Sequence, residues 1–77
     1  MNKARRKWLE DILSRLEDIK DELESVSNEE QEAFDNLPES LQYSEKGDTM
    51  EDNISDIDDA ASDIEDIMSA IQEIIER

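Results

Sequence analysis

Leucine and isoleucine recur at alternating steps of three and four along two long stretches, and this spacing constrains the fold more than any other feature. Residues at such steps share one face of an α-helix and form a heptad seam. The first stretch carries this series with one polar interruption: Leu9, Ile12, Leu16, Ile19, Leu23, Val26, Glu30, Ala33 and Leu37. Trp8, Leu13 and Phe34 widen the face, and neither Gly nor Pro precedes Pro38. We therefore predict a helix over about residues 3–35.

The second stretch repeats the pattern in its own heptad series: Met50, Ile54, Ile57, Ala61, Ile64, Met68, Ile71 and Ile75. A second apolar row, spaced by sevens, lies beside it: Ala60, Ile67 and Ile74. Asp48 and Glu51 have the spacing of a capping box, and acids in a first turn suit the helix dipole. We predict a second helix over about residues 48–76.

The segment between these stretches contains the only Phe, Pro, Tyr and Gly of the chain, all within residues 34–47. Pro38 suits the first position of a short helix, over 38–42. Lys46-Gly47-Asp48 reads as a second break, so we expect a connection over about 36–47. The alternative is one helix running on from Pro38, which would tolerate Gly47 at a cost of about 1 kcal/mol.

These elements predict an all-α fold, with a single domain over residues 1–77. Two long helices joined by a short link pack antiparallel, as a helical hairpin. Each apolar face is wider than a two-stranded seam needs. Small chains usually need disulfides, metals or oligomerisation for stability, and this chain has no Cys. We expect the hairpin to self-associate into a four-helix or larger bundle.

The charge balance narrows the classes of partner. With 24 acids and 8 cations the chain has a net charge of −16, which argues against direct binding of nucleic acid or an anionic membrane. No apolar run approaches a membrane span or a signal-peptide core. We therefore expect a cytoplasmic protein, in the host cytoplasm if a phage encodes it.

Catalytic and metal-binding signatures are missing from the sequence. There is no His to act as a general base, and no Cys. Helical phosphohydrolases bind magnesium through E-E-x-x-E paired with E-x-x-D, but Ala33 stands where Glu29-Glu30 would need the third acid. Nor do the acids around Asp56 match a calcium loop. We expect no enzymatic activity, no metal and no cofactor.

The N-terminus reverses the charge of the rest of the chain. Residues 1–20 hold six of the eight cations and only four acids. Four of these cations cluster beside Trp8: Lys3, Arg5, Arg6 and Lys7. One interpretation is that they pair with Glu73 and Glu76, which an antiparallel hairpin brings nearby. The other is a phosphate-binding cluster, in which Arg forks hold an anion and Trp8 offers a stacking face.

The central segment supplies polar side chains that could complete such a site. One interpretation of the segment is a hydrophobic plug that closes the bundle end, built on Phe34, Leu37 and Leu41. In an antiparallel pair of hairpins, however, the N-terminus of one copy lies beside the central segment of the other. The predicted ligand site therefore combines Arg5, Arg6 and Lys7 with Asn36, Gln42, Tyr43 and Lys46.

A stripe of acids follows the second helix on the face away from its isoleucines: Asp52, Asp56, Asp59, Asp63 and Asp66. Their spacing approaches the charge spacing of one DNA strand. One interpretation is a nucleic-acid mimic that docks on a basic protein surface. The other is a solvated face that keeps the helix soluble.

One run resembles the centre of a family of short acidic helical-hairpin proteins encoded by phages and mobile elements of Gram-positive bacteria. It covers Glu29-Glu30-Gln31-Glu32-Ala33-Phe34-Asp35-Asn36-Leu37-Pro38-Glu39-Ser40-Leu41-Gln42 and continues with Ser44-Glu45-Lys46-Gly47. The resemblance implies a phage-borne accessory protein, and because small phage accessory proteins often counter host defence, we expect that role by analogy. By analogy we expect a homo-oligomer that sequesters a small phosphate-bearing, nucleotide-type ligand between subunits. The alternatives are an acidic inhibitor of a basic host defence protein, and a purely structural oligomerisation module.

Overall fold

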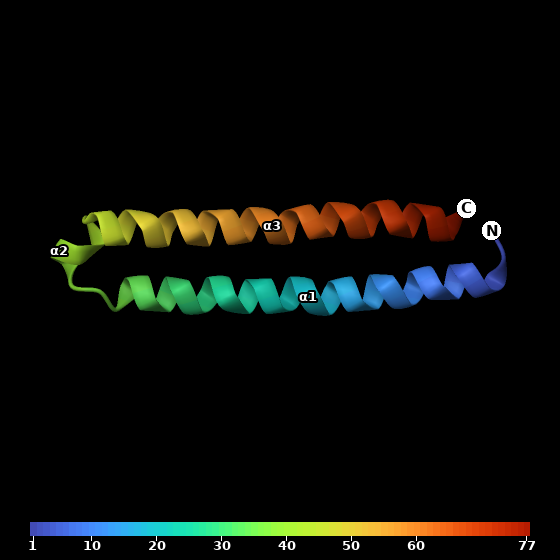
Figure 1. Cartoon of the computed structure of the whole chain (residues 1–77), viewed down its shortest axis with the longest axis horizontal. Helices are drawn as coiled ribbons and strands as arrows, with labels where there is room; N and C mark the ends of the chain where they lie inside the picture. Colours follow the sequence, from blue (N-terminus) through green and yellow to red (C-terminus); the bar gives the residue numbers. More distant parts are fainter.

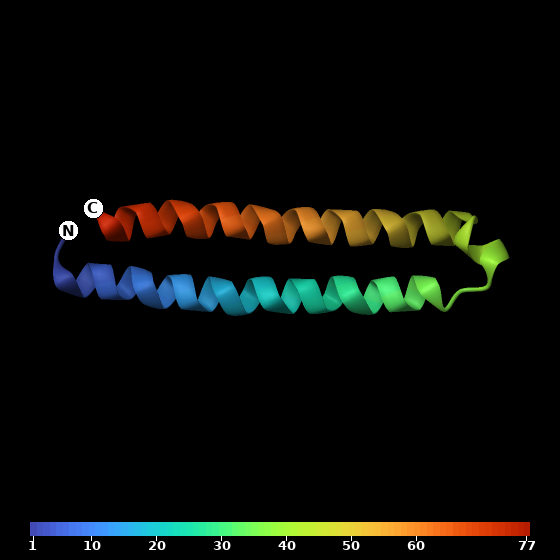
Figure 2. The same ribbon diagram turned by 180° about the vertical axis from the view of Figure 1, so that it is seen from behind.

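The computed structural model describes residues 1–77 and contains three α-helices and no strand, which confirms the all-α class. Two long helices, α1 (Lys3–Asp35) and α3 (Glu45–Glu76), lie side by side along their length. The short helix α2 (Glu39–Gln42) joins them at one end, and both termini lie at the other end (Figure 1 and Figure 2). The molecule is an extended rod that measures 59 × 15 × 12 Å. Neither long helix has an apolar stretch of the length that crossing a membrane requires.

Local interactions set both ends of helix α1. Asn2 has extended backbone, and its Oδ1 accepts a hydrogen bond from the Arg5 N–H at 2.8 Å, which caps the first turn. At the other end, the Asn36 N–H donates to the Glu32 carbonyl at 3.0 Å. Pro38 follows, and a residue before proline is pushed out of the helical region. The helix therefore covers the residues predicted for it.

Helix α3 begins three residues earlier than predicted, at Glu45, so the expected break at Lys46-Gly47-Asp48 is wrong. Its cap is Ser44, not Asp48, because the Ser44 hydroxyl accepts from the Gly47 N–H at 3.4 Å. The alternative of one helix running on from Pro38 is also wrong, since the chain leaves helical hydrogen bonding at Tyr43 and Ser44. Pro38 itself caps α2 rather than opening it.

Gly47 lies buried in the first turn of α3, where that turn meets α2. A Cβ atom at this position would lie 2.1 Å from the Gln42 carbonyl oxygen and 2.7 Å from the Leu41 carbonyl oxygen. The backbones therefore approach too closely for any side chain at position 47. Gly47 permits this close approach between α2 and α3 and does not break the helix.

The face that α3 turns toward α1 is the predicted one. All eight positions of its heptad series are buried or half-buried, with Met50 at 9% and Ala61 at 5% exposure. In the second row, Ala60 and Ile67 are exposed and Ile74 is half-buried. The seam of α3 is thus more buried than the flanking row. We expect this difference because the apolar face is wider than one partner helix can cover.

The face that α1 turns toward α3 differs from the predicted seam at three of its nine positions, and Ile12 is half-buried as predicted. Leu9, Leu16, Leu23 and Glu30 of α1 are half-buried as expected, and so is Leu37 just beyond the helix. The positions between them are occupied by the next residue along: Leu13, Lys20, Ser27 and Phe34. The predicted seam members Ile19, Val26 and Ala33 are exposed instead. Helix α1 is thus rotated from the expected orientation, and it turns two polar side chains inward.

Candidate functional site

The basic residues of the predicted site lie in the first two turns of α1, at the end of the rod where both termini meet. No acid occupies the first turn of α1. Lys3, Arg5 and Lys7 are exposed, and Arg6 is half-buried. Positive side chains at a helix N-terminus oppose the helix dipole, so this end of the rod concentrates positive potential.

None of these four cations forms an ion pair. The ion pairs of the chain are Arg15–Asp11 at 3.2 Å, Lys20–Glu24 at 3.6 Å and Lys20–Glu65 at 3.0 Å. The predicted alternative, pairing of the N-terminal cations with Glu73 and Glu76, is therefore wrong. The Nε of Arg6 lies out of water and has no hydrogen-bond partner. The cluster is left with its charges available to an anion.

Two open clefts adjoin this cluster, and Arg5 and Arg6 belong to different ones. A cleft of about 430 Å³ is lined by Lys3, Arg6, Lys7 and Glu10. An apolar groove of about 420 Å³ is lined by Met1, Arg5, Trp8, Leu9, Ile12 and Ile74. The Trp8 side chain is 65% exposed. A flat ring on Trp8 and a phosphate on the neighbouring cations would therefore occupy adjacent spaces.

The polar residues predicted from the central segment lie at the opposite end of the rod. Within one chain the structure therefore does not bring them near Arg5, Arg6 and Lys7. Tyr43 is 81% exposed, and Asn36 and Lys46 are also exposed. The side-chain amide of Gln42 donates to the Phe34 carbonyl at 3.3 Å and to the Leu37 carbonyl at 3.2 Å. Gln42 thus ties α2 to the end of α1.

The acid stripe of α3 is exposed at all five positions, and none of its carboxylates forms an ion pair. No group of three or more acids lies close enough to hold a metal ion. Glu30, part of the run compared with magnesium-binding helices, accepts a hydrogen bond from Asn53 Nδ2 at 3.1 Å. That contact ties it to α3.

Sequence reasoning missed a row of polar contacts that joins α1 to α3 along one long face. The Ser27 hydroxyl donates to Asp58 Oδ1 at 2.6 Å, and Lys20 Nζ bonds Glu65 Oε2. The hydrogen bond from Lys20 to Glu65, together with the charge of Glu65, raises the pKa of Lys20. Ser27 and Asp58 are 31 residues apart in the sequence, and Lys20 and Glu65 are 45 apart. No local sequence pattern predicts such pairs, so they become visible only once the register of the two helices is known.

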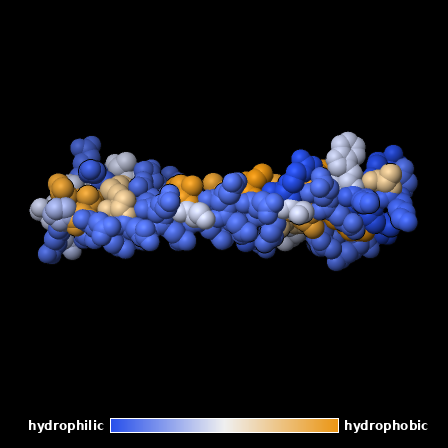
Figure 3. All heavy atoms as spheres, turned by 90° about the horizontal axis from the view of Figure 1, so that it is seen from below, coloured by the Kyte–Doolittle hydropathy of each residue, from blue (hydrophilic) through white to orange (hydrophobic).

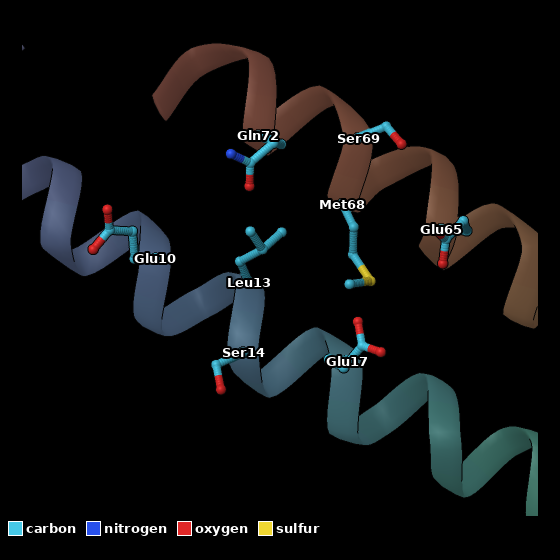
Figure 4. A pocket seen from close by; sticks show the side chains of 8 residues that line it. All are labelled: Glu10, Leu13, Ser14, Glu17, Glu65, Met68, Ser69 and Gln72. Carbon is cyan, nitrogen blue, oxygen red and sulfur yellow. The ribbon is translucent and has the colours of Figure 1, made fainter. Parts of the chain in front are cut away.

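The largest pocket lies on this polar face and measures about 520 Å³. Leu13 and Met68 both project into the space between α1 and α3 (Figure 4). Glu10, Glu17 and Glu65 also line the pocket, together with Ser14, Ser69 and Gln72. Three carboxylates and no cation make it a poor site for a phosphate. The candidate site therefore remains the basic end of α1 with the groove beside Trp8.

No protein-family model, curated protein or solved structure matches this chain.

Proposed function

We propose that this chain is a non-enzymatic, phage-type accessory protein that sequesters a small phosphate-bearing, nucleotide-type ligand at the interface between its own copies. One observation carries the proposal: Lys3, Arg5, Arg6 and Lys7 stay unpaired beside the exposed ring of Trp8, in a chain of net charge −16. Acids outnumber cations three to one in this chain, yet these four cations have no acidic partner within it. We therefore expect them to bind an anion that the chain itself does not supply. The link to host defence rests on the resemblance of residues 29–47 to phage-encoded hairpin proteins.

The chemistry of this end suits a nucleotide. Arg forks bind phosphate oxygens in pairs, and the positive end of the α1 dipole adds to their attraction. Indole rings stack on bases without requiring a particular base. A bound anion would also relieve the repulsion among four neighbouring cations. A bound nucleotide thus explains both the unpaired cations and the exposed indole ring at this end.

Assembly of two hairpins into a four-helix bundle would complete the site. An antiparallel arrangement places the basic end of one copy beside the central segment of the other. Tyr43, Asn36 and Lys46 are exposed there and would contribute a second ring, hydrogen-bond donors and a fifth cation. Gln42 would act indirectly, because its amide already holds the connection in place.

A second function is favoured by the acid stripe of α3. Its five aspartates are exposed and unpaired along a continuous helix of 32 residues. Such a row could dock on the basic groove of a host defence protein in place of nucleic acid. The third alternative, a structural oligomerisation module, needs neither the cation cluster nor the acid stripe.

The test uses Arg5→Ala with Lys7→Ala, since both side chains are exposed and neither forms an ion pair. ATP is the probe, and adenosine and inorganic pyrophosphate separate the contributions of ring and phosphate. Each charge-assisted phosphate contact contributes about 1.5–3 kcal/mol, so the double variant should bind ATP at least about a hundredfold more weakly. Isothermal titration calorimetry gives the affinities, and sedimentation should show an unchanged assembly.

Arg15→Ala is the matched control, because it removes a cation already paired with Asp11. It should leave ATP binding within about twofold of the original chain. A purified protein that holds no co-purified ligand and does not bind ATP would refute sequestration. If Asp56→Asn, Asp59→Asn and Asp63→Asn together destroy anti-defence activity while the Arg5 and Lys7 changes do not, acidic mimicry is the better account.

A further inference from the structure

An apolar face runs along one side of the helix pair, and the chain leaves most of it exposed. It consists of Ile12, Ile19 and Val26 of α1 with Ala60, Ile67 and Ile74 of α3. Each trio is spaced by sevens, and Ile12 and Ile74 line the same groove, so both rows lie on one side. Ile19, Val26 and Ile67 are 46%, 50% and 52% exposed. Figure 3 shows hydrophobic side chains along one edge of a largely hydrophilic surface.

The rows of the apolar face lie level with each other across the two helices. Lys20 bonds Glu65 and Ser27 bonds Asp58, which fixes the register of α1 against α3. That register places Ile19 close to the level of Ile67, and Val26 close to the level of Ala60. From Ile12 to Val26 the face extends about 21 Å by helix rise. The opposite long face is polar, with Ser14, Ser62 and Ser69 among its exposed residues.

The exposed area is larger than a self-sufficient chain of this mass would have. A compact monomer of 8.9 kDa exposes about 4,800 Å² by the usual scaling, whereas this chain exposes 5732 Å². The excess of about 900 Å² is close to the roughly 800 Å² that each partner buries in a stable protein–protein interface. Met50 and Ala61 are the only hydrophobic residues that the isolated chain buries. The excess exposed area is thus about the size that one bound protein partner would cover.

Charge distribution along the rod indicates which partner fits and in which direction. At the end with the termini, residues 1–10 and 70–77 carry five cations and three acids. At the α2 end, residues 29–51 carry eight acids and one cation. An antiparallel second copy sets each basic end beside an acidic end, whereas a parallel copy would set the acidic ends together. A closed twofold pair also covers both apolar faces at once.

We infer that a second copy of this chain docks antiparallel on the apolar face, with Ile19 against Val26 of the other copy. Full lengthwise overlap puts the twofold axis at the middle of the rod. That middle lies between Ile19 and Val26, because α1 is centred on Ile19 and α3 on residues 60–61, which lie level with residues 24–25. The inference specifies the interface that the proposed function assumes, and it rests on that function's self-association but not on its ligand.

Two pairs of substitutions test the face. Ile19→Asp with Ile67→Asp adds two charges at the centre of the apolar face, and Ser14→Asp with Ser69→Asp adds the same charges to the polar face. Burying unpaired carboxylates is costly, so the first pair should raise the dissociation constant at least about a hundredfold. The second pair should change it by less than about threefold. Sedimentation equilibrium of both variants and of the original chain measures these values without any ligand.

Cross-linking tests the orientation and does not require the acidic variant to fold. The chain has no cysteine, so Ile19→Cys with Val26→Cys introduces the only thiols. Isotope mixing and mass spectrometry identify bonds between copies formed by a short bifunctional maleimide. The antiparallel pair predicts 19-to-26 bonds between copies and no 19-to-19 bond in the Ile19→Cys single variant.

A compact 8.9 kDa monomer of the original chain would overturn the inference, as would 19-to-19 bonds or equal dissociation by the two acidic pairs. A dimer that uses this face but binds no ATP would leave the inference standing and remove the proposed ligand. A monomer that binds ATP would overturn the inference and leave the proposed ligand standing.

Discussion

At Gly47 the first turn of α3 passes so close to the end of α2 that no side chain fits between them. The atoms that a Cβ would meet belong to the backbone of Leu41 and Gln42, so they cannot move aside as the tip of a flexible side chain could. Helix propensity alone would favour alanine over glycine at this position by about 1 kcal/mol. The steric conflict acts against that preference, which makes position 47 a sensitive test of the connection.

Gly47→Ala should therefore destabilise the fold despite the gain in helix propensity. Overpacking of this kind costs about 1–3 kcal/mol, and backbone neighbours place it at the upper end of that range. Urea unfolding followed by circular dichroism measures the free energy of unfolding. Ser62→Ala, at an exposed position of the same helix, is the control and should change it by no more than about 0.5 kcal/mol. Stabilisation by Gly47→Ala would show that the connection lies farther from α3.

At the scale of elements, α1 presents one of two overlapping heptad rows to α3. Both rows share Leu9, Leu16 and Leu23, and they differ in whether Ile19 and Val26 or Lys20 and Ser27 complete the seam. The observed choice places Lys20 against Glu65 and Ser27 against Asp58. The more apolar row is thereby left outside, where a second copy can cover it.

The contact between Lys20 and Glu65 predicts a difference in stability at alkaline pH. Glu65 raises the pKa of Lys20 above its usual value of 10.5, so the folded state holds this proton more tightly. The resulting stabilisation is fully present below about pH 10.5 and is lost as the pH rises through the higher folded pKa. In Glu65→Gln the loss of stability between pH 9 and pH 12 should be smaller, as measured by urea unfolding. Glu73→Gln removes an unpaired acid and should retain the original slope; equal slopes in all three proteins would contradict the prediction.

At the scale of the whole molecule, we expect repulsion among acids to outweigh ion pairing. The net charge is −16, and only Arg15 and Lys20 form ion pairs, mostly at exposed positions. Exposed pairs contribute little to stability, while like charges within a Debye length of about 10 Å at 0.1 M salt repel each other. The rod shape spreads these charges along its length, but α3 still carries acids at short intervals from Glu45 to Asp66.

Sodium chloride should therefore raise the melting temperature. We expect a steady increase as the salt concentration rises from about 0.05 M to 0.5 M, because screening weakens the repulsion within the folded state. Circular dichroism at one fixed protein concentration measures it, since the proposed assembly would make the melting temperature depend on concentration. Replacing Asp52, Asp59 and Asp66 by Asn should reduce the slope. A melting temperature that falls with added salt would show that ion pairs dominate instead.

The sequence by itself determined the all-α class, the extent of α1 and the inward face of α3. Each depends on local physics: Asn2 and Pro38 bound α1, and Ile54, Ile57 and Ile64 belong to the one continuous seam that α3 offers. The residue at which α3 starts does not depend on local sequence alone. Gly47 reads as a breaker along the chain, and only the approach of the α2 backbone shows that it is required inside the helix.

The tertiary structure alone decided which row of α1 turns inward and which cations remain free. The two rows share Leu9, Leu16 and Leu23, and the observed row brings Lys20 to Glu65 and Ser27 to Asp58, contacts that spacing along α1 cannot specify. The sequence likewise located the basic cluster but could not exclude its pairing with Glu73 and Glu76. An ion pair depends on atoms approaching to within about 4 Å, and helical periodicity cannot supply that distance between two separate helices.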